Sequence, residues 1–219
     1  METSDQHTGE LSEEGPRQHH VCPWWMGFVI ASPLRKLGEN PERILAPLVE
    51  PGMTAVDIGS AMGFFSLPLA RMVGESGRVV CVDIQERMLR SLVKRARKKG
   101  LEKIIETRVA TTESLELDDL EGAADLALAI HVVHETAYPR SFLTQCHDVL
   151  RPGGTLLILE PKGHVSEDDF EATRQLALDL DFSEVEHDQL KKSLMSVLEK
   201  PQRTRALNRR RTVRSNGSG

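Results

Sequence analysis

The stretch Thr54–Ser66 reads TAVDIGSAMGFFS, an apolar run followed by a turn of small residues. The run contains β-branched residues and follows Pro51-Gly52, which is typical of a buried strand. The turn, Gly59–Gly63, leads into Phe64–Val73, whose apolar spacing suits a helix. Strand, tight turn and helix make half of a βαβ unit, and open sheets of this kind bind ligands at the carboxyl ends of their strands.

Two common nucleotide-binding patterns do not fit this turn. A dinucleotide fingerprint needs glycine at positions 59, 61 and 64, where the chain has Gly59, Ala61 and Phe64. A Walker phosphate loop needs Lys and then Ser or Thr after its last glycine, and Phe64-Phe65 stand there instead. A plain βα turn without a ligand remains the structural alternative.

A second strand, Arg78–Asp83, ends on an acid twenty positions after Gly63. A carboxylate at this place can accept hydrogen bonds from both ribose hydroxyls of a nucleoside. The alternative is that Asp83 only caps the helix expected over Gln85–Lys99. Because the acid closes a strand at a suitable distance from a glycine turn, we favour the ligand role.

Asp57-x-Gly59-x-Ala61-x-Gly63 resembles the first motif of class I S-adenosylmethionine (SAM)-dependent methyltransferases, with Ala61 in place of the middle glycine. Asp83-Ile84 resembles their second motif, and Leu150-x-Pro-Gly-Gly resembles a late signature of the same family. The resemblance implies SAM as the cofactor. It implies cofactor contacts by Asp57, Gly59, Ser60, Ala61, Gly63, Asp83, Ile84, Thr111, Thr112 and Ile130. Thr111 stands where this family usually has an Asp that contacts the adenine.

The predicted fold class is α/β. The remaining chain predicts strands at 104–109, 124–130 and 155–161, and helices at 40–49, 139–149 and 166–181. Strand-like segments at 184–187 and 193–199 would close the sheet as an antiparallel hairpin. The resemblance implies a Rossmann-like, seven-stranded, mainly parallel sheet with helices on both faces and that hairpin at its end.

Length and composition indicate one domain with tails: 219 residues, 39% apolar and 28% charged. We expect a disordered acidic arm at 1–18, an aromatic segment and helix at 19–50, a methyltransferase domain at 51–201 and a basic flexible tail at 202–219. No apolar run is long enough to span a membrane, and three cysteines without ligand spacing favour the reducing cytoplasm.

Both tryptophans of the chain, Trp24 and Trp25, lie in the N-terminal segment. They predict either a packing anchor or a lid that contacts the acceptor. The nearby His19, His20 and Cys22 lack a fourth ligand in sequence, so no metal site is expected.

Titratable side chains follow the fourth and fifth strands. His131, His134 and Glu135 come after the fourth, and His164 comes after the fifth. The carboxyl ends of parallel strands share one edge of a sheet, so these residues can border the methyl acceptor together. His134 is our first candidate for a general base and His131 the second, with Glu135 and His164 as substrate contacts. The alternative is that the histidines serve packing and the start of a helix.

The sequence therefore predicts a SAM-dependent methyltransferase that acts on a small molecule through an O, N or S nucleophile. A less favoured alternative is an RNA or protein acceptor held by the basic tail, since nucleic acid binds clustered arginines. A sheet of this kind would also suit a NAD-dependent oxidoreductase or a SAM-binding protein without catalysis, and both are less favoured still. The sequence does not define the acceptor or the oligomeric state.

Overall fold

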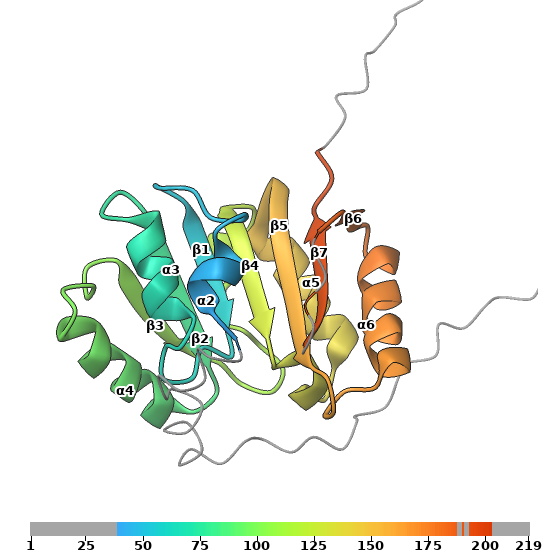
Figure 1. Ribbon diagram of the computed structural model, residues 1–219, viewed down its shortest axis with the longest axis horizontal. Helices are drawn as coiled ribbons and strands as arrows, with labels where there is room; N and C mark the ends of the chain where they lie inside the picture. Colours follow the sequence, from blue (N-terminus) through green and yellow to red (C-terminus); the bar gives the residue numbers. More distant parts are fainter. Residues whose placement is uncertain (1–38, 188–189, 191–192, 203–219) are drawn as a thin grey trace, which may run out of the picture.

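A single sheet of seven strands organises the computed structural model, which describes residues 39–187, 190 and 193–202. The strand order is β3-β2-β1-β4-β5-β7-β6 (Figure 1). The parallel strands are β1 (Thr54–Ile58), β2 (Arg78–Asp83), β3 (Ile105–Val109), β4 (Ala124–Ile130) and β5 (Leu150–Pro161). The strand order reverses between β1 and β4, and this is the position at which open α/β sheets bind ligands.

An antiparallel pair completes the sheet, as the sequence predicts. It consists of β6 (Ser183–Val185) and β7 (Ser193–Glu199). β7 lies between β5 and β6 and runs antiparallel to both. The predicted Rossmann-like architecture is thereby confirmed.

Helices cover both faces of the sheet. One face carries α2 (Pro41–Leu45), α3 (Ser66–Val73) and α4 (Glu86–Arg97), and the other carries α5 (Pro139–Val149) and α6 (Glu167–Asp179) (Figure 1). Two short 3₁₀ turns, η3 (Asp118–Leu120) and η4 (Val133–Glu135), lie on either side of β4 in the sequence.

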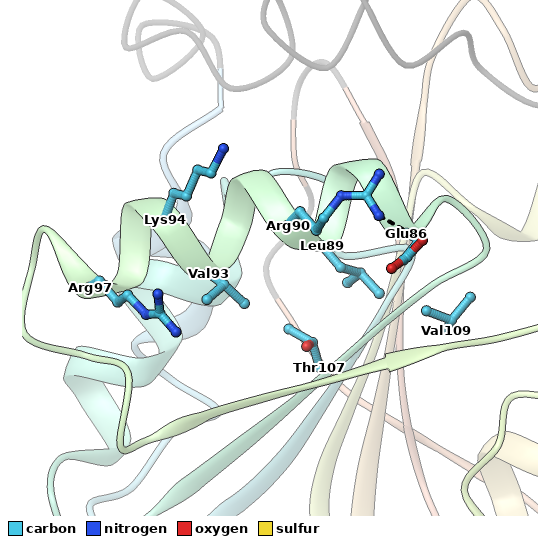
Figure 2. A pocket seen from close by; sticks show the side chains of 8 residues that line it. All are labelled: Glu86, Leu89, Arg90, Val93, Lys94, Arg97, Thr107 and Val109. Atoms are coloured by element: carbon cyan, nitrogen blue, oxygen red, sulfur yellow. Dashed lines mark ion pairs between the residues drawn. The ribbon is translucent and has the colours of Figure 1, made fainter.

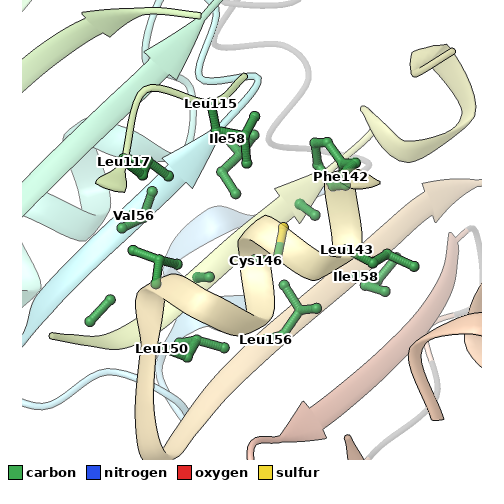
Figure 3. Close-up of a cluster of buried hydrophobic side chains, with 14 of the residues drawn as sticks. Val56, Ile58, Leu115, Leu117, Phe142, Leu143, Cys146, Leu150, Leu156 and Ile158 are labelled. Carbon is green, nitrogen blue, oxygen red and sulfur yellow. The ribbon is translucent and has the colours of Figure 1, made fainter. Parts of the chain in front are cut away.

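Alternation along the strands creates two hydrophobic cores. In β1, Ala55 packs with the α2–α4 side, whereas Val56 and Ile58 pack with the α5 side. Figure 3 shows the core on the α5 side of the sheet, where Phe142 and Cys146 of α5 pack in one cluster with Val56 and Ile58 of β1. Successive side chains of a strand point to opposite faces, so Asp57 shares the face of Ala55 and lies towards α3.

Several element boundaries differ from the sequence-based expectation. α2 ends at Leu45 instead of Val49, because Pro47 has no N–H to continue the helix and disfavours helical geometry in Ala46. β5 begins at Leu150 instead of Thr155, since Leu150 already pairs with Ala124 across an irregularity in the register. The segment expected to be a simple turn is therefore part of the sheet.

Membrane spans, metal sites and disulfides were not expected from the sequence. In the part of the chain that the structure describes, no helix is long and apolar enough to cross a membrane. Within the same ranges, no group of three or more His, Cys, Asp or Glu side chains is arranged to hold a metal ion. Cys81 and Cys146 are buried free thiols. The segment with His19, His20, Cys22, Trp24 and Trp25 lies outside the described residues.

The centre of the sheet makes a first prediction about stability. Leu157 of β5 is fully buried, so Leu157→Ala should lower the free energy of unfolding by about 2–5 kcal/mol, measured by urea denaturation. The control is Val185→Ala on the edge strand β6, where the side chain is 37% exposed and the loss should stay below about 1 kcal/mol. Equal losses in the two variants would contradict the burial described here.

Candidate active site

The glycine turn after β1 is held by backbone hydrogen bonds to β2. The N–H groups of Gly59 and Ser60 both donate to Val82 O, at 2.9 and 3.0 Å. Gly59 has a φ of 75°, and a Cβ there would lie only 2.9 Å from Cβ of Val132. Glycine at position 59 therefore lets the chain after β4 pack directly against the turn.

Ala61 stands at the one position where the first motif departs from the family pattern. Its φ is 46°, in the left-handed region that favours glycine. The strained residue is held from outside the turn, because its N–H donates to Asp83 Oδ2 at 2.9 Å. The departure from glycine thus leaves the shape of the turn intact.

Asp83 accepts two hydrogen bonds from the main chain. Its Oδ1 accepts from Gln85 N at 2.8 Å, and its Oδ2 accepts from Ala61 N. The N-cap residue of α4 is Gln85 and not Asp83. Each carboxylate oxygen keeps a second lone pair for a ligand hydroxyl. Burial raises the pKa of Asp83, and the two backbone N–H groups oppose that rise. Ile84 beside it is 41% exposed and offers an apolar surface.

Asp57 is a buried carboxyl at the end of β1. It accepts a hydrogen bond from Ser66 Oγ of α3, which is the contact that its face of the sheet dictates. Burial raises the pKa of Asp57 to about 7, against the effect of Ser66, and the charge of Asp83 raises it further. Nearby, Ser60 Oγ is buried without a hydrogen-bond partner among the described residues.

A cavity of about 910 Å³ brings almost all the predicted site residues together. This volume is at the upper end of the range for small-molecule and cofactor sites. The predicted residues in its lining are Asp57, Gly59, Ser60, Ala61, Asp83, Ile84, Thr111, Thr112, Ile130, His131, His134, Glu135 and His164. Gly63 is not in the lining, and a Cβ there would meet Leu92 Cγ at 3.0 Å, so this glycine serves packing.

The loop after β3 forms one wall of the cavity. Thr111 Oγ1 accepts from Ser114 N at 2.9 Å and Glu113 N at 3.2 Å, so this hydroxyl shapes its own loop. Gln145 of α5 ties the loop to the domain, because its Oε1 accepts from Leu115 N at 2.8 Å and its Nε2 donates to Glu113 O at 3.0 Å. Gln145 was not predicted from the sequence, because only the fold brings it to the loop.

Two of the three histidines in the cavity lining, His131 and His134, each pair with an acid that was not predicted from the sequence. Nε2 of His131 lies 3.1 Å from Glu39 Oε1, and His131 has a left-handed φ of 57°. His134 Nδ1 lies 2.6 Å from Oε2 of Glu160. The available signal for Glu160 was a lone acid at the end of an apolar strand, Leu156-Leu-Ile-Leu-Glu160.

A second hollow of about 330 Å³ lies between α4 and β3 (Figure 2). Arg90, Lys94 and Arg97 of α4 are among its lining residues, and Glu86 pairs with Arg90 at 2.7 Å. Arg95, from the same basic run, instead donates to Met62 O in the glycine turn. The hollow contains none of the predicted site residues.

Comparison with known proteins identifies the family. The family model described as "Methyltransferase domain" matches residues 49–202. The chain belongs to this methyltransferase family. Membership of this family confirms the predicted SAM-dependent methyltransferase domain and its cofactor, and the oxidoreductase alternative has no support.

Curated relatives of this methyltransferase domain share about half of the chain. The ubiquinone biosynthesis O-methyltransferase of Caulobacter vibrioides is 34% identical over 107 residues, covering 49% of this chain and 40% of the relative. The ubiquinone/menaquinone biosynthesis C-methyltransferase of Escherichia fergusonii is 32% identical over 112 residues, covering 51% and 44%. The chain thus matches less than half the length of these relatives.

Among solved structures, a SAM-dependent methyltransferase from Aquifex aeolicus superposes with a TM-score of 0.74. The match covers 82% of this chain and 100% of that one, at 22% identity. At this level of identity the likeness supports the fold alone.

The methyltransferase cavity offers groups that suit SAM. Asp57 could supply a carboxylate for the ammonium group of the amino acid end, and the Ser60 hydroxyl, which has no hydrogen-bond partner among the described residues, could supply a polar contact beside it. Asp83 has lone pairs for the ribose hydroxyls, and Ile84 with Met88 offers apolar surface for the base. These residues would hold the cofactor, which would supply an electrophilic methyl group in the cavity that His131 and His134 also line.

A second prediction concerns Asp83. Asp83→Asn should weaken SAM binding by about 1–3 kcal/mol in isothermal titration, because a hydrogen bond to a charged group is lost. Glu86→Gln, an exposed acid three residues further on, is the matched control and should bind SAM as the wild type does. Unchanged affinity in Asp83→Asn would remove Asp83 from the cofactor site.

A third prediction follows from the pKa of Asp57. A bound cation favours the carboxylate, so SAM affinity should rise as the pH rises through about 7 and binding should release a proton. Titration in buffers of different ionisation enthalpy measures that proton, and Asp57→Asn should release none.

The same raised pKa sets the sign of the effect on folding. Asp57 stays protonated in the folded chain up to about 7 but ionises near 3.8 when unfolded, so its contribution to stability falls as the pH rises between these values. Asp57→Asn should therefore lose less stability than the wild type between pH 4 and pH 7. An equal loss of unfolding free energy in both proteins between pH 4 and pH 7 would contradict the raised pKa of Asp57.

Proposed function

We propose that this chain transfers the methyl group of SAM to an uncharged small molecule through an O, N or S nucleophile. The observation that carries the proposal is the continuity of the cavity, whose lining runs from Asp57 and Asp83 to His131, His134 and His164. A cofactor at one end and an acceptor at the other would share one space. The similarity to relatives named as ubiquinone biosynthesis methyltransferases supports a small-molecule acceptor.

The charge of the cavity supports an uncharged acceptor. Among the described residues that line it there is no Lys or Arg, whereas Asp57, Asp83, Glu113 and Glu135 are acids. A phosphate or carboxylate would enter against these charges, and like charges brought together cost several kcal/mol. The lining therefore gives no support to a phosphate-rich acceptor such as RNA. The basic tail that motivated the RNA alternative lies outside the described residues from 203 onward.

The residues of the chain supply alignment and proton transfer. When bound, SAM provides an electrophilic methyl group on a sulfonium. The walls of the cavity hold the nucleophile in line with it, and alignment of this kind contributes several kcal/mol. His134, with His131 as the second candidate, accepts the proton of the nucleophile, while Glu135 and His164 contact the acceptor.

Two measurements test this function. Isothermal titration should show binding of SAM and of its demethylated product, and no binding of NADH. Transfer of a labelled methyl group should favour catechol over 3,4-dihydroxybenzoate by at least about tenfold in kcat/KM, since one added carboxylate introduces like-charge repulsion. A preference for the carboxylate, or for RNA oligonucleotides, would contradict the proposed acceptor.

A further inference from the structure

Glu160 is a buried acid that the proposed function does not yet use. It lies near the end of β5, and its side chain is 1% exposed. Both of its oxygens contact residue 134: Oε1 accepts from His134 N at 3.2 Å, and Oε2 lies 2.6 Å from His134 Nδ1. Burying a carboxylate is costly unless it is paired, so this arrangement needs a reason beyond packing.

The contact with the main chain accounts for only one of the two oxygens. It satisfies the N–H of a residue in η4, which a neutral Gln or a water could also do. A carboxylate can only accept, so pairing with an ionised Glu160 would make Nδ1 the donor in this contact. Nε2 is then the ring nitrogen left for the cavity, which His134 lines.

The charges around His134 act in the same direction. The hydrogen bond to Glu160 is the largest influence on the pKa of His134 and raises it, burial opposes that effect, and the charges of Glu160 and Glu135 add to it. His164, Tyr138 and His131, which pairs with Glu39, are further titratable groups in the lining of the cavity. A proton that arrives on the imidazole is thus stabilised by an adjacent carboxylate.

We infer that Glu160 is a positioning residue that holds His134 with Nε2 open as a proton acceptor for the hydroxyl of a methyl acceptor. This inference rests on the proposed function. As the hydroxyl oxygen forms its bond to the methyl carbon, its O–H bond breaks and the proton passes to Nε2. The electron pair of the broken carbon–sulfur bond stays on sulfur, and Glu160 balances the imidazolium.

The deciding experiment needs no acceptor. Long-range ¹H–¹⁵N NMR of the protein saturated with S-adenosylhomocysteine reports the tautomer and pKa of each ring, and His134→Gln identifies the signal of His134 among the eight histidines of the chain. We expect the Nδ1–H tautomer, with a pKa above the ordinary histidine value that falls in Glu160→Gln. Glu121→Gln, an exposed acid in a loop, should leave the pKa unchanged. An Nε2–H tautomer, or a pKa that Glu160→Gln does not change, would overturn the inference.

Turnover of catechol gives a second readout. His134→Ala should lower kcat by about 10²–10⁴-fold. Glu160→Gln should lower the plateau value of kcat in the pH–rate profile at least tenfold and should move the acidic limb of that profile to lower pH. The double variant should be no slower than His134→Ala, because Glu160 acts through His134. Additive losses would show that Glu160 acts separately and would overturn the inference. Every variant should still bind S-adenosylhomocysteine. If the wild type itself does not bind S-adenosylhomocysteine, the proposed function is refuted.

Discussion

The two hydrogen bonds that Asp83 accepts from the main chain are the constraint on which the site depends. One oxygen holds the N–H of Ala61 inside the glycine turn, and the other holds the N–H of Gln85 at the start of α4. The end of β2, the turn after β1 and the next helix are thereby fixed to one carboxylate. Ala61 keeps a left-handed backbone that usually requires glycine, because this contact offsets part of the strain. These two contacts leave a lone pair on each oxygen, so they are compatible with the ligand interpretation of Asp83.

Much of the fold could be predicted from local pattern. The bounds of β2, β4, α5 and β7 agree with the sequence-based segments, since each is an apolar run or stripe with clear breakers at its ends. The errors also have local causes. Pro47 ends α2 early, and the register irregularity between β4 and β5 extends β5 into the Pro-Gly-Gly segment.

The candidate site was less predictable where it depends on pairs of residues from distant segments. The glycine turn and Asp83 were recognisable because their spacing is local, and the cavity does gather them. Glu39 and Glu160 were not, because the partners of His131 and His134 lie 92 and 26 positions away in the chain. Gly63 was assigned to the cofactor from the motif alone, yet its missing Cβ makes room for Leu92. A sequence motif identifies the residues that a turn requires. Only the packing of the folded chain distinguishes the motif residues that line the cavity from those that make room for neighbouring side chains.

The order of strands has a consequence for how the chain is made. During synthesis, β1, β2 and β3 are complete by residue 109, and they can pair with one another because they are neighbours in the sheet. The wall with His131 and His134 waits for β4, which must insert beside β1 on the other side, and Glu160 arrives only with β5. Such non-local pairings form slowly, because a long loop must close first. The nascent chain therefore carries the glycine turn and Asp83 before it carries the two histidines or Glu160.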